Sequence, residues 1–189
     1  MANIAVLYDA CVIYPAPLRD FLMELTLSGL YRAKWSAYIH EEWIRNVLKT
    51  RADITREQLY NIRDLMDLSA ADALVFDYEH IIPSLELPDK NDRHVLAAAI
   101  RSSASVILTF NLKDFPALVL ESYGIEAQHP DEFISNLIDK NPALVCSSAK
   151  LCRNRLKLPP LDVEHYLNNL ERQSLPATVA KLREFEELL

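Results

Sequence analysis

Glycine is scarce in this chain of 189 residues, which has 2 glycines against 10 prolines. These two, Gly29 and Gly124, stand far apart in the sequence. A loop that binds phosphate through backbone amides needs two or three glycines within about eight residues, because side chains would block the approach of the phosphate. The sequence therefore argues against P-loop NTPases, Rossmann dehydrogenases and protein kinases.

Cysteines and long apolar runs are also few. The 3 cysteines, Cys11, Cys146 and Cys152, are too few and too irregularly spaced for a disulfide framework or a thiolate zinc site, and no two histidines form an i, i+4 pair. The first residues carry no basic segment, unlike a signal peptide. The longest uncharged run, residues 102–112, is shorter than the roughly 18 residues of a transmembrane candidate. We therefore expect a cytoplasmic protein with no membrane partner.

Charge is distributed unevenly along the chain, which has 27 acids, 20 bases and a net charge of −7. Residues 1–140 hold 21 acids and 13 bases, whereas residues 141–189 hold 6 acids and 7 bases. An acidic balance argues against a binder of duplex DNA but not against a nuclease, whose site is itself a group of acids. One stretch is locally basic and contains Lys140, Lys150, Arg153, Arg155 and Lys157. It is either a solvated helix face or a contact for a phosphate or an acidic partner.

Hydrophobic patterning predicts an α/β fold. Short apolar or alternating runs predict strands at residues 4–8, 33–36, 73–78, 106–109 and 125–127. Helical spacing predicts helices that begin near Pro15 and end at Gly29, and at residues 37–49, 55–68, 92–101, 115–122 and 131–138. This alternation indicates a parallel sheet covered by helices on both faces. After residue 141 only helical patterns remain, at residues 163–170 and 177–189, which predicts a helical appendage.

Acidic and amide side chains follow the predicted strands. Asp9 follows the first strand, Asn111 and Asp114 follow the fourth, and Asp92 begins the helix that leads into the fourth. In an open parallel sheet these strand ends meet in one crevice if the first and fourth strands are neighbours. Oxygen ligands without histidine or cysteine suit a hard cation such as Mg²⁺ or Mn²⁺. Such a site suits phosphodiester hydrolysis, because the cation lets an acidic site accept an anionic substrate.

Each of these residues also has a purely structural interpretation. Asp92 could be the third residue of a helix capped by Asp89, and Asp114 could cap the following helix. Asp9 could end its strand in a turn, although a carboxylate at the end of a buried strand is costly unless it is paired. The helical pattern of residues 37–49 does not separate Glu41 from Glu42. Serines lack the flanking glycines of a nucleophile elbow, which argues against triad chemistry.

Several segments together resemble a known family. They are LYDACVIYPAPLRDFL, WSAYIHEEWIRN, LPDKNDRHVLAAAI, VILTFNLKDFP and YGIEAQHPDEF. In this combination they are similar to PIN-domain ribonucleases, specifically to the VapC-type toxins of toxin–antitoxin pairs. The similarity covers about residues 3–138, and the remainder resembles the helical C-terminal extension of one VapC subgroup. We therefore predict a nuclease domain at residues 1–138 and a helical extension at residues 139–189.

The resemblance implies a three-layer α/β/α domain around a parallel five-stranded sheet, and it implies site residues. It assigns Asp9, Glu42 and Asp92 to catalysis and to binding Mg²⁺ or Mn²⁺, since Glu42 lies six residues after the serine of the second strand. At the fourth position, where many PIN domains have an aspartate, this chain has Asn111. Asp114 either takes its place as a metal ligand or only caps a helix, and Thr109 and Asn111 would position the scissile phosphate or the waters on the metal.

The resemblance also implies an activity and partners. These are an endoribonuclease that leaves a 5′-phosphate and a 3′-hydroxyl, an RNA substrate, an antitoxin that silences the enzyme and a homodimer. Asn111 at the fourth position motivates the alternative of a PIN-like interaction module without catalytic activity. A phosphatase or receiver domain fits less well, because Asp9-Ala10-Cys11 lacks the second acid of a D-x-D motif.

Overall fold

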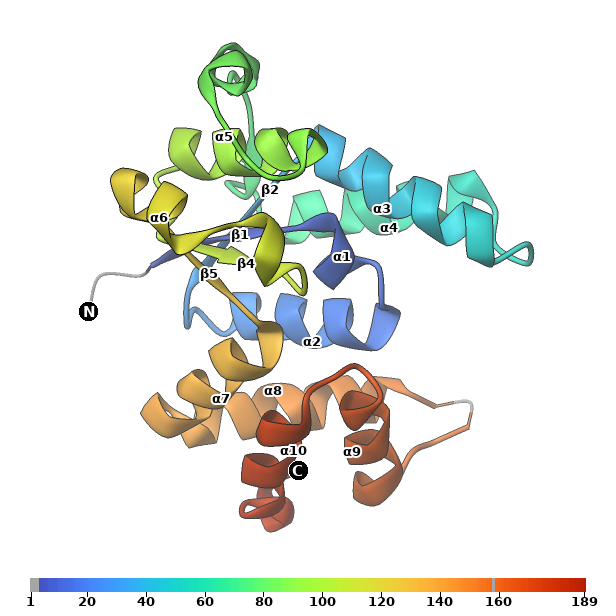
Figure 1. Ribbon diagram of the computed structural model, residues 1–189. Coiled ribbons are helices and arrows are strands. Elements are labelled where there is room, and N and C mark those ends of the chain that lie inside the picture. Colours follow the sequence, from blue (N-terminus) through green and yellow to red (C-terminus); the bar gives the residue numbers. More distant parts are fainter. Residues whose placement is uncertain (1–3, 158) are drawn as a thin grey trace. The chain divides into compact units, whose positions relative to one another are not determined.

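The computed structural model describes residues 4–157 and 159–189, and its internal contacts divide the chain into two units. Unit 1 comprises Met1–Tyr14 and Tyr31–His129, and unit 2 comprises Pro15–Leu30 and Pro130–Leu189. The elements follow the chain as labelled in Figure 1. The boundary predicted between residues 138 and 139 falls inside helix α7 (Pro130–Lys140), which belongs to unit 2.

Unit 1 is built on a five-stranded parallel sheet, as predicted. Its strands run in the order β3 (Leu74–Val75), β2 (Arg32–Ser36), β1 (Ala5–Tyr8), β4 (Val106–Leu108) and β5 (Glu126–Gln128). All four strand pairings are parallel. The first and fourth strands are neighbours, with Tyr8 opposite Leu108, so the chain winds to one side of β1 and then to the other. This arrangement brings together the strand ends that carry the predicted site residues.

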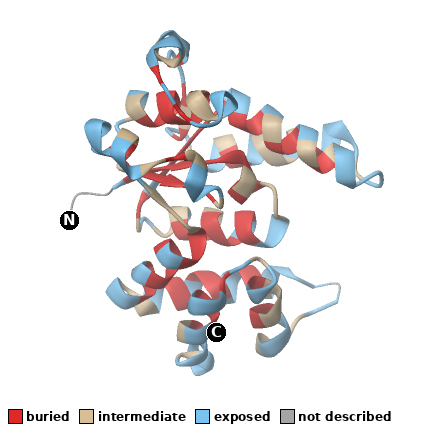
Figure 2. Ribbon diagram, viewed as in Figure 1, coloured by how far each residue is buried: buried red, intermediate tan, exposed pale blue. Residues whose placement is uncertain are grey.

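The centre of the sheet is buried. Every residue of β1 and β4 is at most 3% exposed, and Figure 2 shows these strands as buried. Helix α5 (Arg93–Arg101) packs against β1, β2 and β4. Ala97, Ala98 and Ala99 of this helix are fully buried. Small side chains let the helix pack closely against its neighbours, and Asp92 lies at its N-terminus.

Short elements depart from the predicted ones. Strand β3 ends at Val75 rather than at residue 78, because Asp77 has a φ of +58° and the 3-10 helix η1 (Glu79–Ser84) follows. The single helix predicted at residues 115–122 is instead α6 (Ala117–Leu120) followed by the 3-10 turn η4 (Glu121–Tyr123). Gly124 ends this segment with a φ of +67°, a left-handed conformation that favours glycine. Further short elements are α1 (Ala10–Ile13), η2 (Lys90–Asp92) and η3 (Leu112–Asp114).

Helix α3 (Ala37–Thr50), which carries Glu42, is fixed at its start and along its buried face. Ser36 caps it by accepting a hydrogen bond from the Ile39 amide at 3.2 Å. His40 accepts from Trp43 Nε1 at Nδ1 (2.9 Å), which leaves its Nε2 to face Asp67 (3.0 Å) on helix α4 (Arg56–Ser69). Burial lowers the pKa of His40. This histidine is a structural link between α3 and α4.

Unit 2 consists of helices. Helix α2 (Ala16–Leu27) packs against α8 (Pro142–Arg155) and α9 (Val163–Glu171), and α7 packs against α8 and α10 (Pro176–Arg183). The buried Asp131 carboxylate accepts hydrogen bonds from the amides of Ala177 (2.9 Å) and Thr178 (2.7 Å) at the start of α10. The helix predicted at residues 177–189 ends at Arg183, and the 3-10 turn η5 (Glu186–Leu188) follows after Phe185. Most of the basic stretch belongs to α8, a helix that the sequence patterns did not single out.

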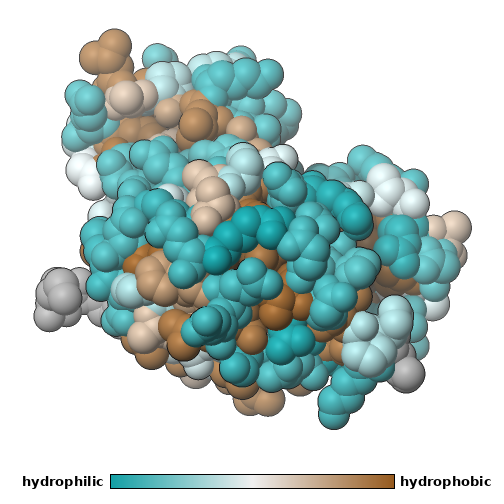
Figure 3. Space-filling view, turned by 90° about the horizontal axis from the view of Figure 1, so that it is seen from below, coloured by the Kyte–Doolittle hydropathy of each residue, from teal (hydrophilic) through white to brown (hydrophobic). Residues whose placement is uncertain are grey.

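The surface has no extended apolar face in the view of Figure 3, where hydrophobic side chains form separate patches among hydrophilic ones. Exposed leucines of unit 2 are Leu27, Leu144, Leu151, Leu156 and Leu188. Within residues 4–157 and 159–189, none of the helices has the length and apolar character needed to cross a membrane.

Candidate active site

A cavity of about 400 Å³ lies in unit 1 beside the ends of β1 and β4. Four of the predicted site residues line it, namely Asp9, Glu42, Asp92 and Asn111. They come from four separate parts of the chain, which the strand order and the packing of α3 and α5 bring together. This is the crevice predicted at the point where the sheet reverses its winding.

Asp9 is held in the wall of this cavity by hydrogen bonds from two neighbouring side chains. Its backbone amide donates to the Leu108 carbonyl at 3.1 Å, which links the end of β1 to β4. Its Oδ2 accepts from Thr109 Oγ1 at 2.7 Å and from Cys11 Sγ at 3.1 Å. The Asn111 amide donates to the same Thr109 hydroxyl at 3.0 Å. Thr109 is fully buried and does not line the cavity, so it positions Asp9 and the turn at Asn111 instead of facing a ligand.

Asp9 and Asp92 each have a raised pKa, because they are partly removed from water and lie near other acids. Burial raises the pKa of Asp9, and the charge of Glu42 adds to this, while the hydrogen bonds from Thr109 and Cys11 act in the opposite direction. Burial raises the pKa of Asp92 to about 7, with further contributions from Asp9, Asp89, Asp114 and Glu42. Like charges in one crevice are costly unless a cation or a proton joins them, which is common at functional sites.

Glu42 and Glu41 are separated by the fold, although the sequence pattern did not distinguish them. Glu42 lines the acid cavity, and its Oε2 lies 3.3 Å from Nε2 of the buried His94. Glu41 is exposed and contacts Arg56 at 3.4 Å. The resemblance assigned Glu42 to the site, and Glu42 lines the same cavity as Asp9 and Asp92.

The structure bears out the capping interpretation of Asp92 but not that of Asp114. Asp89 accepts from the Asn91 amide at 2.8 Å and so caps η2, of which Asp92 is the third residue. Asp92 is also the N-cap residue of α5, and its side chain makes no cap hydrogen bond among the described residues. Pro116, not Asp114, precedes α6. Asp114 does not line the acid cavity, although its charge contributes to the raised pKa of Asp92.

The donor set fits a hard divalent cation. Its members are carboxylates and an amide, and Mg²⁺ binds through one or two protein carboxylates while it keeps several waters. Within the described residues, no three histidine, cysteine, aspartate or glutamate side chains are close enough together to hold a metal ion as they stand. The acids therefore suit a cation in chemistry without forming a closed cage.

Sequence analysis missed several residues of the cavity. Asn46 and Lys49 line it from α3, one and two turns after Glu42, together with Cys11, Tyr14 and Thr50. Spacing on the same helix face could have indicated Asn46, since it stands four residues after Glu42. Lys49 is a cation at the border of an acidic cavity and is suited to contact a phosphate. Burial raises the pKa of Cys11, so this thiol is a neutral hydrogen-bond donor to Asp9.

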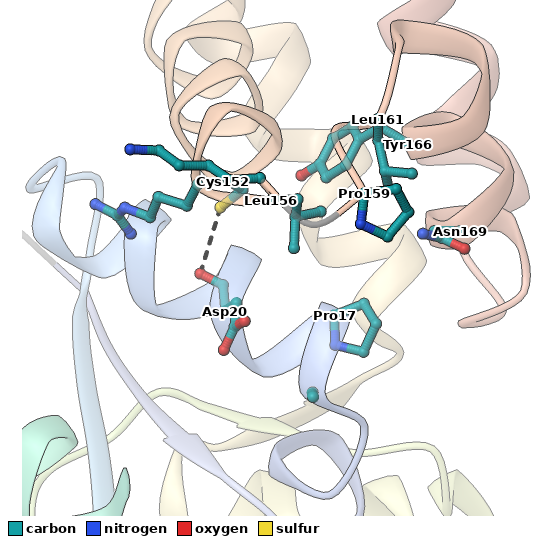
Figure 4. Close-up of a pocket in the computed structure, with 11 residues that line it drawn as sticks. Pro17, Asp20, Cys152, Leu156, Pro159, Leu161, Tyr166 and Asn169 are labelled. Atoms are coloured by element: carbon teal, nitrogen blue, oxygen red, sulfur yellow. Dashed lines mark hydrogen bonds between the residues drawn. The ribbon is translucent and has the colours of Figure 1, made fainter.

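A larger cavity of about 630 Å³ lies within unit 2, between α2, α8 and α9 (Figure 4). Its lining is mainly apolar and includes Pro17, Leu156, Leu161 and the buried Tyr166. Asp20 is the acid among its lining residues, and Cys152 Sγ donates to the Asp20 carbonyl at 3.6 Å, as Figure 4 shows. This cavity lacks the group of carboxylates found in unit 1.

Comparisons with known proteins agree with this geometry. Residues 5–113 match the model of the PIN domain, and residues 130–184 match that of the VapC50 C-terminal domain. A protein of Mycobacterium tuberculosis (strain ATCC 25618 / H37Rv), named "Putative ribonuclease VapC50", is 48% identical over 67 residues. That match covers 35% of this chain and 39% of the relative's length. A search of the solved structures found no match.

The first of these matches covers more than half of the chain and includes β1, β2, β3 and β4 with the helices between them. It contains Asp9, Glu42 and Asp92. The resemblance implied a parallel five-stranded sheet, and the structure has such a sheet, in the order β3-β2-β1-β4-β5. The second match lies wholly within unit 2. The chain belongs to the PIN-domain family, with a C-terminal region of the VapC50 type.

Proposed function

We propose that this protein is an endoribonuclease that depends on Mg²⁺ or Mn²⁺. The observation that carries the proposal is the cavity in which Asp9, Glu42 and Asp92 meet, with the pKa of Asp92 raised to about 7 by burial and neighbouring acids. The name of the Mycobacterium tuberculosis relative, a ribonuclease, supports the same substrate class.

Asp9, Glu42 and Asp92 would hold the cation in this proposal. When bound, a divalent cation would neutralise charge on the scissile phosphate and lower the pKa of a water molecule. Asn111 and Lys49 border the cavity and would orient the RNA backbone. Asp114, which does not line the cavity, would act on Asp92 through its negative charge without contacting the substrate. Thr109 would keep the Asp9 carboxylate in place through its 2.7 Å hydrogen bond.

Cleavage of single-stranded RNA by the purified chain tests this proposal. We expect cleavage with Mg²⁺ or Mn²⁺ that stops with EDTA and that is lost in Asp9→Asn and Asp92→Asn. The matched control is Asp64→Asn, an exposed aspartate of α4 paired with Arg63. Cleavage that persists at the wild-type rate in Asp92→Asn, or that does not need a metal, would contradict the assignment.

We further propose that the enzyme is a cytoplasmic toxin silenced by a cognate antitoxin, and that it pairs as a homodimer. Expression should arrest growth, and an antitoxin encoded next to this chain should relieve the arrest. Light scattering of the purified chain would give the oligomeric state.

A PIN-like interaction module is the second candidate, because Asn111 lacks the charge of an aspartate at the fourth position. Absence of metal binding up to millimolar Mg²⁺ or Mn²⁺, together with normal growth, would favour that alternative.

A further inference from the structure

A second hollow, of about 690 Å³, adjoins the acid cavity within unit 1. His94 lines this hollow, and its Nε2 lies 3.3 Å from the Glu42 carboxylate that lines the acid cavity. The two cavities also share a chain segment, since Asn91 lines the hollow and the next residue, Asp92, lines the acid cavity. A molecule that extends from the acids along the protein therefore has this hollow as its neighbouring site.

Helix α3 contributes an aromatic ring, Tyr38, to the hollow, together with Ala37 and Glu41. Tyr38 is 51% exposed, and its ring centroid lies 4.1 Å from that of His94, which is 5% exposed. Tyr38 stands four residues before Glu42 on the same helix, so both side chains are on one face of α3. The packing on His94 fixes the Tyr38 ring, while half of its surface stays open to solvent. Such a ring is a platform for a flat ligand.

Polar groups line the rest of the hollow. The exposed side chains of Glu79, Lys90 and Asn91 are among its lining residues, and Ile82 adds an apolar contact. A carboxylate accepts hydrogen bonds from the amino groups of adenine, cytosine or guanine, and a lysine contacts phosphate. This combination of an aromatic ring, an acceptor and a cation is how proteins recognise an unpaired base and its nucleotide backbone.

We propose that Tyr38 stacks with an unpaired base of the RNA next to the scissile phosphate, and that Glu79 favours a base bearing an exocyclic amino group. This inference rests on the proposed ribonuclease function and specifies how that site selects its substrate. Uracil has no exocyclic amino group, so oligonucleotides in which uracil occupies this position bind more weakly. Lys90 contacts the phosphate of the same nucleotide.

Binding of RNA by variants of Tyr38 tests the stacking. The assay is fluorescence anisotropy with the full chain carrying Asp9→Asn, to prevent cleavage, and a ten-residue oligo(U) with one central A, C, G or U. Loss of stacking on one base raises the Kd about tenfold, so we expect this rise for Tyr38→Ala. Tyr38→Phe and Tyr38→Trp should retain the affinity, whereas Tyr38→Leu, which keeps an apolar side chain over His94, should not.

Matched variants test specificity and separate a local effect from a general one. Glu79→Ala should reduce the preference for A, C and G over U, with little effect on the oligo(U) control. Tyr123→Ala removes another exposed tyrosine, 43% exposed on η4 and outside both cavities, and should leave the Kd unchanged. A Kd unchanged in Tyr38→Ala, or an affinity retained in Tyr38→Leu, would overturn the proposal and leave the hollow to a protein partner.

A cleavage assay with Asp9 intact distinguishes a failure of this inference from a failure of the proposed function. In that assay Tyr38→Ala should raise KM more than it lowers kcat, because stacking holds the substrate and the transition state alike. Cleavage with an unaltered KM in Tyr38→Ala would refute the base platform and leave the nuclease assignment intact. A chain with Asp9 intact that neither binds nor cleaves RNA would refute both.

Discussion

Replacing Asp92 by asparagine should stabilise the metal-free protein at pH 8. The carboxylate is half-buried and is surrounded by the charges of Asp9, Asp89, Asp114 and Glu42, which raise its pKa from 3.8 to about 7. At full strength this shift corresponds to about 4 kcal/mol. Because the side chain is partly open to water, screening reduces the effect, and we expect a gain of about 1.5 kcal/mol. For a chain of this length that gain raises the melting temperature by about 3–6 °C.

The pH dependence of this gain follows from linkage. A carboxyl group whose pKa is raised in the folded state binds its proton more tightly there than in the unfolded chain. Its contribution to stability is complete below the unfolded pKa of 3.8, falls as the pH rises and is lost above about pH 7. The advantage of Asp92→Asn should therefore be small near pH 4.5 and reach its full size by pH 8.

Thermal unfolding in EDTA at both pH values measures this difference, with Asp64→Asn as the control for a change of charge at an exposed site. The change in melting temperature caused by Asp64→Asn is subtracted from that caused by Asp92→Asn at each pH. Comparing the two results then cancels the contribution of the other titrating groups. An advantage of the same size at both pH values, or no advantage at pH 8, would refute the account of Asp92 as a carboxylate destabilised by its neighbours.

Three further predictions address the cation, the wall of the cavity and a turn. Mn²⁺ should raise the melting temperature more at pH 8 than at pH 6, because it competes with the proton on Asp92, and a thermal shift lost in Asp9→Asn would show that the acids bind it. Thr109→Val removes the donor to Asp9 and the acceptor of the Asn111 amide, and we expect it to lower the unfolding free energy by about 1–3 kcal/mol in denaturant titration, with reduced cleavage. Gly124→Ala should cost about 1 kcal/mol, because φ is +67° even though no atom lies within 4 Å of the added Cβ; an unchanged midpoint would contradict this.

The sheet could be predicted because its signal is local. Residues 4–8 and 106–109 are short runs rich in apolar residues, which is typical of strands that are buried on both faces of a parallel sheet. The two-residue strand β3 was overestimated, because the end of that strand depends on the positive φ of Asp77, which alternation does not encode. Helix α8 was missed because its apolar residues are weakly periodic, and because it packs against α2, which is distant in sequence, as well as against the preceding helix α7.

Part of the candidate site could also be predicted from local sequence patterns, and part could not. Asp9 and Asp92 could be proposed from their places at element ends, but choosing Glu42 over Glu41 needed the motif resemblance. The fold separates them through the orientation of α3, which Ser36 and the hydrogen bonds of His40 determine. The hydrogen bond between His40 and Asp67 joins α3 to α4, so the helical pattern of residues 37–49 alone does not contain this information.

An aspartate at the fourth position would combine two roles, which this chain divides between Asn111 and Asp114. An aspartate directly after the fourth strand would add both a ligand and a negative charge to the crevice. Here the amide of Asn111 lines the cavity, whereas the carboxylate of Asp114 acts on Asp92 through its charge without lining it. In the proposed site, the uncharged Asn111 beside Asp9 would reduce repulsion within the cavity, while Asp114 keeps the negative charge around Asp92 high. In the same proposal, a chain with so little glycine would bind a phosphate through side chains and a cation, the role that a glycine-rich backbone loop has in other folds.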